Sequence, residues 1–235
     1  MPRYKHLFFD MDMTIAPSRQ PILQEMYDLL TGLPHDITIV SGQTVENIGW
    51  QSNKLPARYL GQNGNHATDI EDNELWYLAL DDAHKDEIRA HIDTLITLLG
   101  EDYELPHDDL APIEDRGGQI TFSPVGNTAP VEVKKVFDPD RKKRESLLKQ
   151  HPFVSEELIV KIGGSTGLDY IHKDRHKGTN VKRLIDHLGW SDDDCVYFGD
   201  GLYPGGNDEA VIGVIETIAV DDHLDTYQKL KEMFG

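Results

Sequence analysis

An apolar run that begins near Tyr4 ends in two carboxylates, and this feature constrains the fold more than any other in the sequence. The run reaches Phe9 and is followed by Asp10 and Asp12. A short apolar run of this kind predicts a buried strand of a parallel sheet. Residues i and i+2 of an extended segment point to the same side, so both carboxylates can reach one small site. Aspartates after a strand also cap helices or shape turns, which is the alternative interpretation of this pair taken alone.

Strands and helices alternate in the two outer parts of the chain. After the first strand, short apolar runs typical of strands alternate with segments in which apolar residues recur at helical spacing. This pattern extends to residue 80 and resumes from residue 178. Such alternation predicts an α/β domain with a doubly wound parallel sheet. The expected strands are 37–40, 58–60, 195–198 and 215–220, and the expected helices are 22–30, 45–50, 178–188, 207–212 and 223–234.

The middle of the chain follows a different pattern. A helix is expected over 82–99, because Ile88, Ile92 and Leu95 recur at helical spacing. A charged helix is expected over 139–150, with Pro139 in its first turn. The remaining runs predict strands at 111–115, 119–123, 158–162 and 167–171. We therefore expect an α/β domain formed by residues 1–80 and 173–235, with an α+β domain, residues 81–172, inserted into it.

Composition excludes several classes of protein. The 235 residues carry 42 acidic and 23 basic side chains, a net charge of −19, which disfavours nucleic acid or an anionic membrane as a partner. No apolar run approaches the roughly 20 residues that span a bilayer, and Cys195, the single cysteine, excludes an internal disulfide and a cysteine metal cluster. The N-terminus leads directly into the first strand and leaves no room for a signal peptide. We expect a cytoplasmic protein.

Four short polar segments follow predicted strands or open predicted helices of the α/β part. They are Asp10-Met-Asp-Met-Thr14, Ser41-Gly42, Lys177-Gly178, and Gly199-Asp200 continuing to Asn207-Asp208. In an open α/β sheet, the carboxyl ends of the strands meet at one edge, where ligands bind. We therefore expect the four segments to form one site.

Phosphoryl transfer through an aspartyl phosphate is a reaction that these residue types can perform. A carboxylate nucleophile approaches a phosphate dianion only when its charge is balanced, and Mg²⁺ held by carboxylates provides that balance. Asp10 and Asp200 are the expected ligand pair, with Asp208 as an outer ligand or orienting group. The Ser41 hydroxyl and the Lys177 ammonium group are suited to hold the transferring oxygens.

Asp12 has a separate role in this scheme. Its carboxyl group can protonate the leaving oxygen and then deprotonate the attacking water or sugar hydroxyl.

The order of the four segments resembles that of the haloacid dehalogenase (HAD) superfamily, and the insertion resembles its type IIB cap. The resemblance implies a HAD core with an inserted cap that determines substrate specificity. It implies that Asp10 is the nucleophile and a Mg²⁺ ligand, and that Asp12 is the general acid and base and also binds Mg²⁺ through its backbone carbonyl. It also implies that Ser41 and Lys177 contact the phosphoryl group and that Asp200 binds the metal.

A closer resemblance is to HAD-type phosphomannomutases. It rests on Pro204–Asp208, on the segment from Arg116 to Gly126, and on Gly163-Gly164 followed by Asp169. It implies that Arg19 and Arg116 contact phosphate groups, that Lys134 stands where a further phosphate-binding arginine is usual, and that Asp169 contacts sugar hydroxyls. Pairing with a neighbouring acid on the first loop is the alternative role for Arg19, and a salt bridge on the cap surface is the alternative for Arg116.

The departures from the mutase pattern determine the expected activity. Asn127 replaces an arginine, Lys134 replaces another, Gly167 replaces a phosphate-binding serine, and Met13 replaces a glycine. Each loss in the cap weakens phosphate binding by roughly 1–3 kcal/mol, since lysine and asparagine lack the bidentate fork of arginine.

We therefore expect a Mg²⁺-dependent phosphatase that hydrolyses a sugar phosphate. The alternative is a phosphomannomutase that interconverts hexose 1- and 6-phosphates, and a third hypothesis is a non-catalytic sugar-phosphate binder. The mutase resemblance also implies a homodimer formed through the cap.

Overall fold

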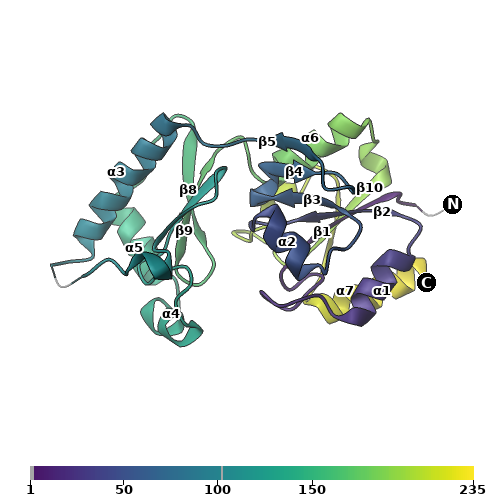
Figure 1. Cartoon of the computed structure of the whole chain (residues 1–235), viewed down its shortest axis with the longest axis horizontal. Helices are drawn as coiled ribbons and strands as arrows, with labels where there is room; N and C mark the ends of the chain where they lie inside the picture. Colours follow the sequence, from purple (N-terminus) through teal and green to yellow (C-terminus); the bar gives the residue numbers. More distant parts are fainter. Residues whose placement is uncertain (1–2, 102) are drawn as a thin grey trace. The chain divides into compact units, whose positions relative to one another are not determined.

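The chain forms two compact units, as seen in the computed structural model, which describes residues 3–101 and 103–235 (Figure 1). The first unit, the core, spans Met1–Tyr77 and Arg175–Gly235, and the second unit, the cap, spans Leu78–Asp174. The boundaries expected from the sequence, after residues 80 and 172, differ from these by a few residues. The cap is therefore an insertion between two segments of the core.

The core contains a seven-stranded sheet of order β11-β10-β1-β2-β3-β4-β5. The strands from β11 to β3 run parallel, and β4 and β5 are antiparallel to their neighbours. This is the α/β class with a parallel sheet that the strand–helix alternation predicts. The strands are β1 (His6–Asp10), β2 (Asp36–Val40), β3 (Arg58–Gly61), β4 (His66–Thr68), β5 (Glu74–Tyr77), β10 (Cys195–Gly199) and β11 (Glu216–Ala219).

Helices cover both faces of the core sheet. Because side chains alternate along a strand, successive residues of β1 pack against helices on opposite faces. Leu7 and Phe9 of β1 join the hydrophobic cluster that includes α1 (Gln24–Gly32), α2 (Val45–Gln51) and α7 (His223–Phe234). Phe8 points to the other face and joins the cluster that includes α6 (Lys177–Leu188). A strand that is buried on both faces shows no polar alternation, which explains the continuous apolar run at the start of the chain.

Strands β4 and β5 have no counterpart in the sequence-based prediction. They are joined by a turn in which the Asp69 carboxylate accepts hydrogen bonds from the backbone amides of Glu71 (2.8 Å) and Asn73 (2.9 Å). Strands of three or four residues are too short to show a period in the sequence. The tertiary pairing with β3 determines their formation instead.

The cap contains a four-stranded antiparallel sheet of order β6-β7-β9-β8. Helix α3 (Asp82–Leu98) and helix α5 (Lys142–Gln150) contribute Ile88, Ile92 and Leu147 to the hydrophobic cluster on one face of this sheet. The strands are β6 (Ile113–Asp115), β7 (Gln119–Phe122), β8 (Leu158–Gly163) and β9 (Gly167–His172). The insertion is thus an α+β domain, as the sequence predicts.

Two helix predictions are wrong in detail, and one helix, α4 (Val131–Phe137), was not predicted. The helix expected near residue 207 is a single 3-10 turn, Glu209–Val211. The charged helix starts at Lys142 rather than near Pro139. The Asp138 carboxylate accepts hydrogen bonds from the amides of Lys143 (3.0 Å) and Arg144 (3.3 Å), so this side chain determines where the helix begins.

Arg144, on this charged helix, is fully buried. Its guanidinium group is paired with Asp138 at 2.6 Å and also donates hydrogen bonds to the carbonyl oxygens of Gly163 (2.9 Å) and Gly167 (3.0 Å). The two glycines lie at the facing ends of β8 and β9. Arg144 therefore fixes the turn of this hairpin to α5.

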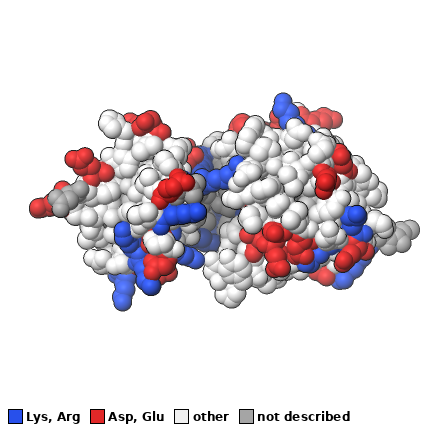
Figure 2. Space-filling view, turned by 90° about the horizontal axis from the view of Figure 1, so that it is seen from below, with Lys and Arg blue, Asp and Glu red and all other residues white. Residues whose placement is uncertain are grey.

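The excess negative charge is distributed over the surface. Acidic side chains appear on both units in Figure 2, with lysine and arginine side chains among them. Among the described residues, no helix has both the length and the apolar composition needed to cross a bilayer.

Candidate active site

Asp10 lies at the carboxyl end of β1, between the ends of β10 and β2. Asp10 pairs in register with Val40, and Phe9 pairs with Phe198. Ser41 and Asp200 follow these two neighbouring strands directly. Because parallel strands end at a common edge, three of the polar residues predicted from the sequence come from adjacent strand ends.

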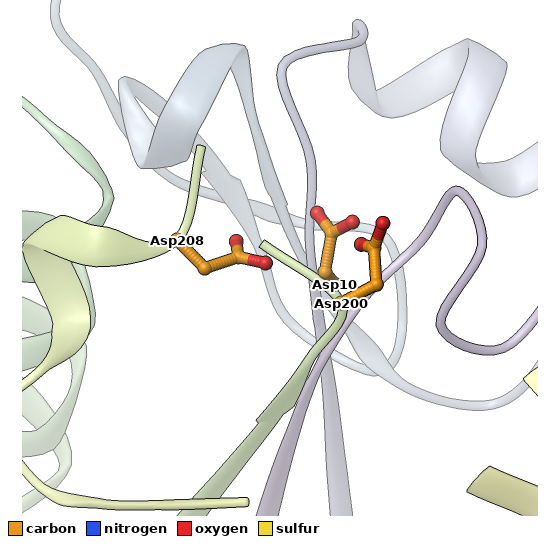
Figure 3. A group of neighbouring side chains, drawn as sticks. All are labelled: Asp10, Asp200 and Asp208. Atoms are coloured by element: carbon orange, nitrogen blue, oxygen red, sulfur yellow. The ribbon is translucent and has the colours of Figure 1, made fainter. Parts of the chain in front are cut away.

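Three carboxylates gather at this edge. Asp10, Asp200 and Asp208 each place an oxygen within 4.8 Å of the other two (Figure 3). Carboxylates this close repel one another, and hard oxygen donors are the ligands that Mg²⁺ prefers. The donor set therefore fits a divalent cation of this kind.

Both oxygens of the Asp208 carboxylate already accept hydrogen bonds from the protein. Its Oδ1 accepts hydrogen bonds from Lys177 Nζ and Tyr197 Oη, both at 2.7 Å, and its Oδ2 accepts one from the amide of Gly201 at 3.1 Å. Asp10 and Asp200 are thus the better placed direct ligands. Asp208 contacts Lys177, and its outer role at the metal stays a prediction.

Lys177 is the buried cation of the site. Only 3 % of the residue is exposed, and its ammonium group donates hydrogen bonds to both Asp10 and Asp208. It is the first residue of α6, and the following residue, Gly178, lets the helix approach the loop after β10. A Cβ atom at Gly178 would lie 1.8 Å from the carbonyl oxygen of Ala210. Gly178 is therefore required for packing, and Lys177 supplies the positive charge of the site.

Burial and charge shift the protonation equilibria of this group in opposite directions. Burial raises the pKa of Asp10 to about 8, against the opposing charge of Lys177. Burial alone would lower the pKa of Lys177, but the charges of Asp10 and Asp208 reverse this effect and raise it. Burial and the charge of Asp208 also raise the pKa of Asp200. A bound divalent cation favours the ionised carboxylates and lowers such pKa values.

Thr14 holds Asp200 in place. Its buried hydroxyl accepts a hydrogen bond from the amide of Asp200 at 3.1 Å and lies 3.3 Å from Oδ1 of the same residue. Thr14 belongs to the first motif, but no pattern in the sequence assigns it a role.

The Asp12 carboxylate contacts three hydrogen-bond donors. It accepts hydrogen bonds from the backbone amide of Arg19 (2.6 Å) and from the side-chain amides of Gln51 (2.9 Å) and Gln43 (3.1 Å). Gln43 also donates a hydrogen bond to Gln51 at 2.6 Å. Metal binding by its backbone carbonyl stays a prediction.

The two glutamines were missed in the sequence analysis. Gln51 is fully buried although it belongs to helix α2, and Gln43 directly follows the Ser41-Gly42 motif. A glutamine on a short amphipathic helix resembles an exposed residue in sequence, so no pattern distinguished it. Their place beside Asp12 makes them positioning residues for the predicted general acid and base.

Ser41 is buried and its orientation is fixed by the turn that follows β2. Its Oγ accepts a hydrogen bond from the amide of Gln43 at 3.2 Å, which leaves the hydroxyl proton for another acceptor. The carbonyl oxygen of Ser41 accepts a hydrogen bond from the amide of Asn63 at 2.8 Å. These contacts suit the predicted role of a phosphate-oxygen donor.

The loop after Asp12 contains two residues with left-handed backbones. Met13 has φ of 62° and Arg19 has φ of 54°. This conformation explains why glycine is usual at the position of Met13 in the pattern that the chain resembles. The Arg19 side chain is exposed and forms no ion pair within residues 3–101 and 103–235. Pairing with an acidic neighbour, the alternative considered for this residue, is absent there.

Two of the other predicted binding residues, Arg116 and Asp169, lie in the cap, on the face of its sheet opposite the hydrophobic cluster. Ile120 and Tyr170 face the helices, so their neighbours Thr121 and Asp169 face the other way. We call this second side the polar face; it is formed by Glu114, Arg116, Gln119, Thr121, Lys161 and Asp169. Asp169 accepts a hydrogen bond from the Thr121 hydroxyl at 2.7 Å, and burial raises its pKa.

Arg116 forms an ion pair with Glu114 at 2.6 Å. This is the cap salt bridge considered as its alternative role. Burial would lower the pKa of Arg116, but the charge and the hydrogen bond of Glu114 raise it. The charge of Asp169 acts in the same direction. The structure thus places Arg116 and Asp169 on one face of one sheet.

Lys134 is buried on α4, and its ammonium group donates a hydrogen bond to the carbonyl oxygen of Asn127 at 2.5 Å. The Asn127 side-chain amide in turn donates hydrogen bonds to the carbonyl oxygens of Ala111 (2.8 Å) and Thr121 (3.4 Å). The two positions at which the chain departs from the arginine pattern are therefore in direct contact, and both stabilise the loop beside β7.

Comparisons with other proteins agree with this geometry. The family model for eukaryotic phosphomannomutase matches residues 76–235. The phosphomannomutase of Schizosaccharomyces pombe is 26 % identical over 252 residues, an alignment that covers 97 % of this chain and 94 % of the relative. Phosphomannomutase 1 of Dictyostelium discoideum is 26 % identical over 245 residues, which cover 96 % of this chain and 95 % of the relative.

Solved structures of similar fold include hydrolases. A haloacid dehalogenase-like hydrolase from Bacteroides thetaiotaomicron superposes with a TM-score of 0.64 at 12 % identity, covering 98 % of this chain and all (100 %) of that chain. The IMP-nucleotidase of Plasmodium falciparum superposes with a TM-score of 0.66 at 15 % identity, covering 98 % of this chain and 68 % of that chain. At these identities the similarity shows the fold alone.

Proposed function

The chain belongs to the eukaryotic phosphomannomutase family, within the haloacid dehalogenase superfamily, and we propose that it isomerises hexose 1- and 6-phosphates through an aspartyl phosphate at Asp10. The observation that carries the phosphoryl-transfer step is the buried contact of Asp10 with Lys177 beside the Asp200 carboxylate. The similarity to phosphomannomutases along the chain supports the isomerase over other reactions of this type.

The proposed reaction has two transfers that mirror each other. The Asp10 carboxylate attacks the phosphorus atom of the substrate or of a bisphosphate activator, and the oxygen–phosphorus bond of the sugar breaks. Asp12 gives a proton to the leaving sugar oxygen. In the return transfer, Asp12 removes the proton from a free hydroxyl of the hexose or, where a bisphosphate was the donor, of a hexose monophosphate, and that oxygen attacks the phosphorus held on Asp10. The bond between Asp10 and phosphorus breaks and free Asp10 is regenerated. Return to an oxygen other than the one that left changes the position of the phosphoryl group.

The residues around Asp10 have distinct parts in these transfers. Lys177 and the Ser41 hydroxyl stabilise the negative charge on the equatorial oxygens of the transferring group. Asp10 and Asp200 would hold Mg²⁺, with Asp208 as an orienting group. A bound Mg²⁺ would neutralise part of the negative charge on the nucleophile and the phosphate, and so reduce their repulsion. Gln43 and Gln51 keep the Asp12 carboxylate in one orientation between its two proton transfers.

The comparisons favour the mutase over the phosphatase that the sequence analysis ranked first. That ranking rested on arginine geometry, because Asn127 removes a charge and a bidentate fork and Lys134 supplies a point charge without the fork. Lys134 is a buried cation, however, and Arg116 lies on the polar face. The cap thus keeps two cations at positions where the mutase pattern has arginines.

A phosphatase is the second candidate, and the Asn127 side chain favours it. Its amide is engaged with two backbone carbonyl oxygens instead of offering donors to a phosphate group. A hydrolase needs only water as the acceptor, and therefore tolerates a cap that releases the sugar early.

One assay separates the two candidates. The purified protein is incubated with Mg²⁺ and mannose 1-phosphate, with and without a hexose 1,6-bisphosphate, and free phosphate and hexose 6-phosphate are measured in the same sample. A mutase forms hexose 6-phosphate in excess of free phosphate. Free phosphate without isomer would establish the phosphatase and refute the isomerase.

A further inference from the structure

Lys161 lies in a row of side chains that crosses the polar face of the cap sheet. It pairs in register with Asp169 on β9, Asp169 pairs with Thr121 on β7, and Thr121 pairs with Glu114 on β6. Residues paired across antiparallel strands share a face, so all four side chains project to the same side. The row contains one cation and two carboxylates.

The sheet leaves room around the Lys161 side chain. The next residue of β8 on this face is Gly163, and its partner across the hairpin is Gly167. A Cβ atom at Gly163 would lie 1.8 Å from Oδ2 of Asp169, so the glycine is required for the carboxylate to occupy its position. Neither glycine places a side chain beside the ammonium group of Lys161.

Lys161 differs in its partners from the other cations near this face. Arg116 is paired with Glu114, and Lys134 donates a hydrogen bond to the Asn127 carbonyl oxygen. Lys161 is exposed, and within the described part of the chain its ammonium group has neither an ion pair nor a hydrogen bond. It is therefore able to pair with an incoming anion without breaking an existing contact.

The charge balance of the polar face depends on this residue. Glu114 and Asp169 are acidic, and Arg116 offsets one of them. Without Lys161 these groups sum to one negative charge, which repels a phosphate dianion at short range. With Lys161 they sum to zero, and the positive charge lies directly opposite Asp169.

We infer that Lys161 is a specificity-determining residue whose ammonium group binds the non-reacting phosphate of a hexose phosphate. The inference rests on the proposed function, since it assigns a further binding group to the same substrate. It implies that β8, the edge strand of the cap sheet, carries a phosphate-binding charge in addition to those expected from β6 and α4.

Calorimetric titration tests the role of Lys161 directly. A hexose 1,6-bisphosphate is titrated with Mg²⁺ into the full chain carrying Asp10→Asn, alone and combined with Lys161→Met, Lys161→Arg or Lys149→Met. Lys149 is an exposed lysine of α5 and serves as the matched control. We expect Lys161→Met to weaken binding about tenfold, because a charge-assisted contact to phosphate is lost, and the other two changes to alter Kd by less than about twofold.

A ligand with a single phosphate separates this role from a general loss of charge. The binding of p-nitrophenyl phosphate, which has no second anionic group, should be the same with and without Lys161→Met. Equal affinity of both proteins for the bisphosphate, or no binding of it by the Asp10→Asn protein, would overturn the inference. A failure of the proposed function alone would give a different result. The unmodified enzyme would then form no hexose 6-phosphate, while Lys161→Met would still weaken the binding of the bisphosphate to the Asp10→Asn protein.

Discussion

Lys177 and Asp10 form a buried ion pair although 167 positions separate them in the sequence. The same ammonium group contacts Asp208, which is anchored by Tyr197 and by the amide of Gly201. The nucleophile expected from the first motif is therefore held by the third and fourth motifs. This arrangement makes the charge of Lys177 a requirement for both the stability and the reactivity of the site.

Replacing Lys177 by methionine should abolish turnover and destabilise the core. The change leaves Asp10 and Asp208 buried without their shared cation, and breaking a buried pair in this way costs about 3–5 kcal/mol of unfolding free energy. Urea denaturation and the rate of hexose 6-phosphate formation measure the two effects. Lys182→Met is the control, since Lys182 lies on the same helix in exposed ion pairs, and it should cost less than about 1 kcal/mol. Equal effects of both changes would contradict the assigned role.

Mg²⁺ should stabilise the protein through Asp200. At a concentration about 100 times its Kd, an ion that binds only the folded state adds about 2.7 kcal/mol to the unfolding free energy. Asp200→Asn should remove most of this gain and should not lower the stability measured in EDTA, because burial and Asp208 already disfavour the ionised form and raise the pKa of Asp200. Thermal unfolding with and without Mg²⁺ provides the comparison.

Asp193→Asn, at an exposed position outside the carboxylate cluster, should keep the full response to Mg²⁺. A response to Mg²⁺ that survives Asp200→Asn unchanged would place the ion elsewhere.

The cap should depend on Arg144 for its stability. Arg144→Met leaves the buried Asp138 carboxylate unpaired and frees three carbonyl oxygens at the turn between β8 and β9. The expected loss is about 3–5 kcal/mol of unfolding free energy, and adding Asp138→Asn should restore part of it. Chemical denaturation measures both variants. Lys142→Met, in an exposed pair on the same helix, is the neutral control; a loss of similar size there would refute the special role of Arg144.

Stability should fall as the pH drops through the range in which histidine titrates. Burial lowers the pKa of His91, which lies between the Tyr170 hydroxyl (2.7 Å) and the carbonyl oxygen of His151 (3.0 Å). Below about pH 6.5 the unfolded chain therefore binds a proton that the folded chain does not, and the unfolding free energy decreases with decreasing pH. Burial lowers the pKa values of His6 and His35 as well, which adds to the same slope.

The contribution of His91 can be isolated by substitution. His91→Gln should reduce the decrease in unfolding free energy between about pH 7 and pH 5, measured by urea denaturation at each pH. His107→Gln changes an exposed histidine and should leave the slope unaltered. An identical pH dependence in the His91 variant would show that this histidine does not titrate differently in the two states.

The sequence predicts the core site well because its residues follow buried strands. The apolar runs before Asp10, Ser41 and Asp200 are visible as patterns, and the topology of a parallel sheet then brings their ends together. Gln51 is different, since a single buried glutamine within a short helix produces no periodic signal. Strand β4 and helix α4 were missed for a related reason, because tertiary contacts stabilise elements of this length more than local propensity does.

In the cap, contacts between residues that are not adjacent in the sequence were not predicted. Asn127 and Lys134 appear in the sequence as two separate losses of arginine, but they are joined by a hydrogen bond and stabilise one loop. Lys161 did not enter the prediction, because its relation to Asp169 depends on strand register rather than on distance along the chain. The ranking of phosphatase above mutase rested on the loss of the bidentate arginine fork at Asn127 and Lys134.

The most direct test of the account is to find where the phosphoryl group resides during turnover. The enzyme is mixed with a hexose 1,6-bisphosphate and Mg²⁺, quenched in acid, reduced with borohydride and digested for mass spectrometry. An aspartyl phosphate at Asp10 is reduced to homoserine at that position, and this is the result that the account predicts, with no such product in the Asp10→Asn protein. An unmodified Asp10 in protein that turns over substrate, or the modification on another residue, would show that Asp10 is not the nucleophile.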